Sequence, residues 1–186
     1  MDEEKTVTIK KSDLWRYATF VLIAVVVVGG FFVLRDGSST GQVIDSGNSG
    51  SLSKETLEGS TFLVTGDSIC TDKNGKPYVI LFSTTWCPHC TWIKDTFGSL
   101  ATGKYSDRIN VQHWELDTGD NTLTPEIETK VPAEITALYQ KYNPSGSIPT
   151  FVFGCAYYRV GNGYERADDL NAELEDFELV IGNLLK

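Results

Sequence analysis

Residues 78–90 read YVILFSTTWCPHC, and this stretch decides the fold. The apolar run at 78–82 has the length and composition of a buried strand, and apolar residues recur at helical spacing after Cys90. Cys87 and Cys90 therefore lie where a strand passes into the first turn of a helix. Because the partial positive charge of a helix N-terminus stabilises a thiolate, this layout is typical of a thiol–disulfide exchange site.

A second signal lies far along the chain, where residues 147–150 read SIPT and introduce another apolar run. Together, the two signals resemble the thioredoxin superfamily. The resemblance covers residues 55–186 and implies an α/β thioredoxin fold, a central mixed sheet flanked by helices. It also implies an inserted loop at 118–131 that the smallest members lack.

The periodicity of the chain predicts elements in an order that fits this fold. Residues 117–122 are expected to form a polar loop. We expect helices over 92–100, 132–142 and 170–184. We expect strands at 61–65, 78–83, 109–116, 150–153 and 156–160.

The N-terminal segment predicts a membrane anchor. Eighteen residues without a charge, 17–34, separate Arg16 from Arg35, which is enough helix to cross a hydrocarbon core. The alternative is a cleaved signal peptide. Most of the nearby Lys and Arg residues come before this segment, so residues 1–16 are expected in the cytoplasm.

The remainder of the chain is then expected on the outer side of the cell membrane, held by a single span. Residues 35–54 are rich in Gly and Ser and predict a flexible tether before the domain at 55–186. The whole chain has 25 Asp and Glu against 16 Lys and Arg, a formal net charge of −9. Since an acidic surface repels phosphate backbones, we expect no nucleic-acid partner.

The resemblance assigns roles to the CPHC motif. It implies that Cys87 is the exposed nucleophile and that Cys90 resolves the mixed disulfide. It also implies that His89 can interact with the Cys87 thiolate; the alternative is an exposed histidine without a role. Pro88 and His89 resemble the DsbA-like oxidants, whereas Trp86 matches the thioredoxin-like start of the motif, so the direction of electron flow stays open.

The same resemblance identifies Pro149 as the family's cis-proline; the alternative is an ordinary trans proline that opens a strand. In the family this loop lies against the cysteines. The backbone of the preceding residue, here Ile148, would pair with a substrate peptide as an added strand, with Trp86 beside it. Many members also carry a buried acid six positions before the nucleophile, and here that position holds Leu81.

A second cysteine pair, Cys70 and Cys155, falls at the pole of the implied fold that is opposite the motif. We hypothesise a structural disulfide between them; the alternatives are two free thiols or a second redox centre. A zinc site would need two ligands besides the CPHC pair, and the candidates Cys70, Cys155, His89 and His113 form no second paired motif. We therefore expect no metal, and no cofactor apart from the redox-active disulfide.

These observations predict a membrane-anchored thiol–disulfide oxidoreductase that oxidises or isomerises exported proteins. An integral-membrane redox partner would have to recycle it. One alternative is a reductant that delivers electrons to exported proteins, as in cytochrome c maturation. Another is an adaptor that binds clients without catalysis.

Overall fold

The computed structural model describes residues 55–186. The predictions of a cytoplasmic segment at 1–16, a membrane span at 17–34 and a tether at 35–54 lie outside the described residues. Within the described part, no helix combines the length and the hydrophobicity needed to cross a bilayer.

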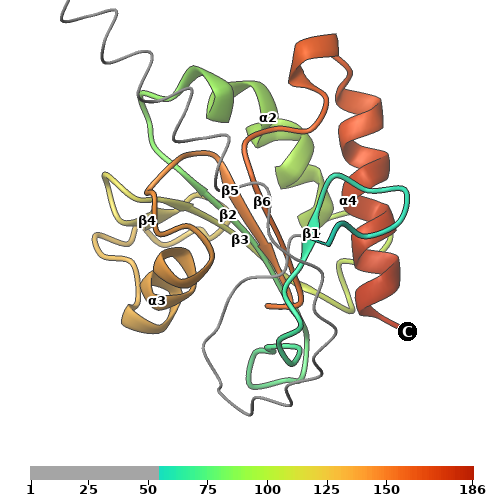
Figure 1. The fold of residues 1–186 in the computed structure, drawn as a ribbon. Helices are drawn as coiled ribbons and strands as arrows, with labels where there is room; N and C mark the ends of the chain where they lie inside the picture. The colour runs from blue at the N-terminus through green and yellow to red at the C-terminus, as the bar shows by residue number, and fades with distance from the viewer. Residues whose placement is uncertain (1–54) are drawn as a thin grey trace, which may run out of the picture. The chain divides into compact units, whose positions relative to one another are not determined.

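A six-stranded sheet forms the centre of the domain, with strand order β1-β6-β5-β2-β3-β4 (Figure 1). Only β2 and β3 run parallel to each other, and the other neighbouring pairs are antiparallel. The strands are β1 (Leu63–Val64), β2 (Tyr78–Ser83), β3 (Asn110–Glu115), β4 (Asp120–Asn121), β5 (Thr150–Phe153) and β6 (Tyr157–Val160).

Helices cover both faces of this sheet (Figure 1). α2 (Pro88–Gly98) and α4 (Leu170–Leu184) pack on one face, and α3 (Ala133–Tyr142) packs on the other. Short 3₁₀ turns, η1 (Ser99–Ala101) and η2 (Glu165–Ala167), follow α2 and precede α4. The mixed sheet with helices on both faces confirms the α/β architecture expected from the sequence.

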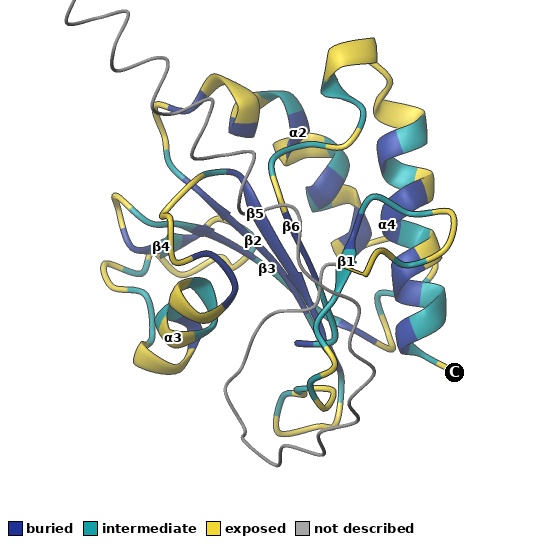
Figure 2. Cartoon of the chain, viewed as in Figure 1, coloured by how far each residue is buried: buried dark blue, intermediate teal, exposed yellow. Residues whose placement is uncertain are grey.

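The central strand β2 explains the uninterrupted apolar run in the sequence. Successive side chains of a strand point to opposite faces of the sheet. Val79 and Leu81 enter the core beneath α2 and α4, whereas Ile80 and Phe82 enter the core beneath α3. Because both faces are covered, β2 has no solvent-facing polar side, and it is dark blue for most of its length in Figure 2.

One expectation about the elements was wrong. The segment 117–122 is not wholly loop, because it contains β4, which pairs antiparallel with the end of β3. β4 is two polar residues long, so it has no alternation of apolar side chains that the sequence could show. Asn121 is held by its side chain instead, because its Oδ1 accepts the backbone N–H of His113 at 3.0 Å.

Candidate active site

The CPHC motif lies at the junction between β2 and α2. Cys87 is the N-cap of α2, Pro88 is its first residue and Cys90 lies in its first turn. Cys87 and Cys90 form a disulfide with their Cα atoms 5.3 Å apart. The Cys90 N–H donates a hydrogen bond to the Cys87 sulfur at 3.1 Å. A thiolate on Cys87 would thus gain a hydrogen bond and the favourable end of the helix dipole.

The expectation that Cys87 is exposed was wrong for this oxidised state. Cys87 is only 3% exposed, because its sulfur is bonded to Cys90 against the first turn of α2. The exposed side chains are its neighbours: Trp86 is 72% exposed, and Pro88 and His89 are also at the surface. The exposed surface at this site is therefore formed by the rim of the motif and not by the sulfur atoms.

The loop before β5 lies at the same end of the sheet as the motif. The Ile148–Pro149 peptide bond is cis. Phe82 of β2 pairs with Thr150 of β5, so Pro149 stands beside the end of the strand that leads to the cysteines. The Pro149 carbonyl accepts the Gly161 N–H at 2.8 Å. Within residues 55–186 the backbone of Ile148 makes no hydrogen bond, and its N–H and C=O are unpaired.

His89 contacts a residue that the sequence did not suggest. Its ring Nδ1 lies 2.7 Å from Glu165 Oε1. The Asn162 amide joins the two, donating to the His89 carbonyl and to Glu165 Oε2, each at 2.9 Å. Burial raises the pKa of Glu165, but the hydrogen bonds from His89 and Asn162 outweigh it, and the pKa is lowered overall. Neither expectation for His89, contact with the thiolate or no role, anticipated this contact.

The segment between β6 and α4 contacts α2 at a second point. The Trp92 indole N–H donates to Asp168 Oδ1 at 2.8 Å. A hollow of about 610 Å³ opens beside the first contact and is lined by His89, Asn162, Gly163, Glu165 and Arg166. Asn162 and Glu165 lie more than seventy positions after His89 in the chain, so no local sequence pattern around the motif could have indicated them.

A buried ionic cluster holds the segment between β6 and α4 in place. Arg159 of β6 pairs with Asp176 at 3.1 Å and with Glu173, and all three side chains are buried. The second oxygen of the Glu173 carboxylate accepts the backbone N–H groups of Gly163 and Tyr164, at 3.0 and 2.8 Å. The cluster therefore links α4 and β6 to the loop that contacts His89.

Leu81, at the position where many family members carry an acid, is fully buried. Beside it on β3 lies His113, which is also buried and which the sequence indicated only as a metal-ligand candidate. Its ring nitrogens are 2.7 Å from Ser83 Oγ and 2.8 Å from Thr122 Oγ1. Burial, with a smaller contribution from Lys94, lowers the pKa of His113 to about 4. His113 is therefore neutral at physiological pH.

Residues 68–178 match the family model described as a thioredoxin-like domain, which is more than half of the 186-residue chain. The chain belongs to the thioredoxin-like domain family. No curated protein sequence matches it significantly.

Three solved structures are similar to this thioredoxin-like chain. The germline-specific thioredoxin Deadhead from Drosophila melanogaster is 24% identical, with a TM-score of 0.36, and the match covers 57% of this chain and 79% of that one. The oxidoreductase NmDsbA1 from N. meningitidis is 14% identical, with a TM-score of 0.44 and coverages of 68% and 93%. A glutaredoxin from Methanosarcina mazei is 18% identical, with a TM-score of 0.32 and coverages of 56% and 99%.

The second cysteine pair of the thioredoxin-like domain is a disulfide, as hypothesised from the sequence. Cys70 and Cys155 have their Cα atoms 5.4 Å apart. The bond joins the segment before β2 to the turn between β5 and β6, at the end of β5 away from Pro149. Residues 55–186 contain no cluster of three or more His, Cys, Asp or Glu side chains placed to hold a metal ion.

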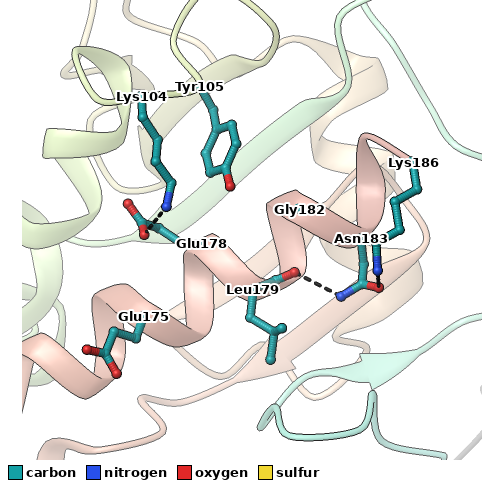
Figure 3. Close-up of a pocket in the computed structure, with 8 residues that line it drawn as sticks. All are labelled: Lys104, Tyr105, Glu175, Glu178, Leu179, Gly182, Asn183 and Lys186. Carbon is teal, nitrogen blue, oxygen red and sulfur yellow. Dashed lines mark hydrogen bonds and ion pairs between the residues drawn. The ribbon is translucent and has the colours of Figure 1, made fainter.

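Another hollow of the thioredoxin-like domain, of about 390 Å³, lies between α4 and the chain after η1 (Figure 3). Lys104 and Glu178 form an ion pair across it at 2.5 Å, and Asn183 bonds both Lys186 and the Leu179 carbonyl. None of the residues expected at the site lines this hollow. The cysteine end of the sheet therefore remains the candidate active site.

Proposed function

We propose that this chain is a membrane-anchored thiol–disulfide oxidoreductase that oxidises or isomerises the disulfides of exported proteins. One observation carries the proposal: the Cys87–Cys90 disulfide lies at the N-terminus of α2, and the backbone N–H of Cys90 donates to the Cys87 sulfur. In a thioredoxin-like domain this arrangement supports thiol–disulfide redox activity, because it stabilises the thiolate that forms when the pair is reduced.

In the oxidising direction, a substrate thiolate attacks the Cys87 sulfur, the S–S bond breaks, and Cys90 leaves as a thiolate that takes up a proton. A second substrate thiolate then attacks the substrate sulfur of the mixed disulfide and releases the Cys87 thiolate. Two electrons pass from the substrate dithiol to the Cys87–Cys90 pair, and the substrate gains a disulfide. The exchange itself uses the sulfur atoms alone and requires no bound cofactor.

The substrate peptide would lie on the surface between Trp86 and the cis-proline loop. The unpaired N–H and C=O of Ile148 are available to an added strand, and the exposed indole of Trp86 offers apolar contact beside the cysteines. Such pairing through the backbone suits a protein that acts on many unfolded chains, because it places few demands on their side chains.

The location of the enzyme is part of the proposal and is supported by the sequence. The uncharged segment 17–34, preceded by most of the nearby Lys and Arg residues, would hold the catalytic domain at the outer face of the membrane. Disulfides persist in such a compartment. Its substrates would be exported proteins, and an integral-membrane redox partner would reoxidise the pair after each turnover.

A reductant is the second candidate, favoured by Trp86 directly before Cys87, the start that the resemblance associates with reducing thioredoxins. The reduction potential of the Cys87–Cys90 pair separates the two candidates. We would equilibrate the full-length protein with glutathione buffers and quantify the oxidised pair by mass spectrometry, with Cys87→Ser as the control that cannot form it. A value near −120 mV supports the oxidant, whereas about −270 mV supports the reductant.

A pair that does not exchange with glutathione at all would refute both enzymatic candidates. That result, together with full biological effect from the Cys87→Ser variant, would favour the client-binding adaptor.

A further inference from the structure

The imidazole of His89 is tied to the segment after β6 rather than left free beside the cysteines. An ionised carboxylate can only accept hydrogen bonds, so the 2.7 Å contact is a donation from His89 Nδ1–H to Glu165. Asn162 donates to the carbonyl of His89 and to the same carboxylate, so backbone and ring are both held. His89 thus has a defined partner although its side chain is 63% exposed.

Glu165 lies in the segment between β6 and α4, which several hydrogen bonds hold in place. The buried carboxylate of Glu173 accepts two backbone N–H groups of the loop, and the Arg159 side chain donates to the Gly161 carbonyl at 3.0 Å. Asp168 accepts the indole N–H of Trp92 at the other end of the loop. Glu165 therefore faces His89 from a fixed position.

The charges around His89 are mixed. Glu165 stays ionised at neutral pH, since the hydrogen bonds from His89 and Asn162 outweigh the effect of burial and lower its pKa. Other charged residues near this end of the domain include Arg166 in the same hollow, Asp168 against α2, Lys94 and Asp95 on α2 itself, and Asp117, which accepts hydrogen bonds from Thr85 two residues before Cys87. Among these groups, only Glu165 contacts the imidazole directly.

We propose that Glu165 is a positioning residue that competes with the Cys87 thiolate for His89 and so restrains the oxidising strength of the Cys87–Cys90 disulfide. The proposal deepens the proposed function and rests on it. Its physical basis is simple: reduction creates a negative charge on Cys87, and an imidazolium beside it would stabilise that charge. The Glu165 carboxylate accepts the hydrogen bond that the Nδ1–H of His89 donates, so this proton is not available to the thiolate. The carboxylate also adds a negative charge of its own.

The direction of the effect follows. Removing the carboxylate frees the imidazole to interact with the Cys87 thiolate and removes a negative charge from the same region. Both changes favour the thiolate, so the reduced pair gains stability relative to the disulfide. A disulfide whose reduced form is more stable is a stronger oxidant.

The test compares Glu165→Gln, His89→Ala and the double variant with the wild-type full-length protein. After reduction of the pair, the rate of Cys87 alkylation by iodoacetamide is followed as a function of pH, and the label is located by mass spectrometry. We expect Glu165→Gln to raise the thiolate fraction of Cys87 below its pKa roughly two- to fivefold, the range that an exposed ion pair supports. At a pH above the pKa of Cys87, the equilibrium with glutathione should shift by the same factor.

Both effects should be clearly smaller in the His89→Ala background, where only the negative charge of Glu165 is removed and no imidazole is freed. Glu134→Gln, which makes the same change at an exposed position on α3 across the sheet, is the matched control and should behave as wild type. An unchanged titration in Glu165→Gln would overturn the proposal. So would an equal shift with and without His89, because Glu165 would then act only as a distant charge.

Titration of the thiol requires no protein substrate, so this result is separate from the proposed function. A shifted titration together with no oxidation of reduced protein substrates would reject the proposed function and keep the assignment of Glu165. An unshifted titration together with active exchange would do the reverse.

Discussion

At the residue scale, His113 couples the stability of the domain to pH. Its native pKa of about 4 lies below the value of 6.5 expected for an unfolded chain. Between these values the unfolded state binds a proton that the native state excludes, so stability falls as pH falls from 6.5 toward 4. The cause is the burial of the imidazole between Ser83 and Thr122, where a positive charge would be poorly solvated.

We expect the wild-type protein to lose about 2 kcal/mol more of its free energy of unfolding between pH 7 and pH 5 than a His113→Gln variant does. Glutamine keeps hydrogen-bonding atoms at the site but does not titrate. Urea denaturation at the two pH values measures the difference, and other acidic groups cancel because both proteins carry them. Equal pH dependence in the two proteins would show that His113 does not titrate in this range.

At the element scale, the ionic cluster of Arg159, Glu173 and Asp176 joins β6 to α4. The guanidinium of Arg159 also lies over the rings of Phe62 and Phe151, with its central carbon 4.6 Å from each centroid. The cation is thus enclosed by carboxylates and aromatic faces. Removing one partner from a buried ion pair leaves an uncompensated charge, which costs more than the pair itself contributes.

We expect Arg159→Met to lower the free energy of unfolding by about 3 to 5 kcal/mol, because two buried carboxylates lose their cation. Lys104→Met is the matched control, since it removes a lysine from the exposed pair with Glu178 and should change stability little. Urea denaturation of the three proteins gives the comparison. Similar losses of free energy of unfolding in both variants would mean that burial does not increase the contribution of the cluster to stability.

At the scale of the whole molecule, the Cys70–Cys155 disulfide closes a span of 85 residues that includes the active site. The bond constrains the unfolded chain more than the folded one. We expect replacement of both cysteines by alanine to lower the free energy of unfolding by about 4 to 5 kcal/mol, from the chain-entropy model. The potential of the Cys87–Cys90 pair should stay unchanged, since the two bonds lie at opposite ends of β5.

Urea denaturation and glutathione equilibration of this double variant separate a structural bond from a second redox centre. A changed potential at Cys87–Cys90 with little loss of stability would favour the redox centre. The matched control is the wild-type protein with only the Cys87–Cys90 pair reduced, which leaves the 85-residue span closed.

Local sequence was enough to predict the strand at 78–83, the helix that follows the cysteines, and the position of Cys87 and Cys90 at their junction. These features depend on side-chain periodicity within about ten residues, which a single stretch of chain contains. The SIPT motif likewise indicated the cis-proline loop, and the resemblance carried the Cys70–Cys155 hypothesis. β4 was not predicted, because its two residues are polar and show no apolar pattern; contacts with other residues hold them in the sheet.

The partners of the motif were decided only by the packing of distant segments. The loop after β6 brings Glu165 and Asn162 to His89 across more than seventy residues, and burial of Cys87 follows from its bond to Cys90 against α2. Sequence alone therefore determined where the reactive sulfur atoms lie along the chain. Strand order and the buried Arg159 cluster decided which charges surround them, because electrostatic contacts depend on distance in space and not on separation along the chain.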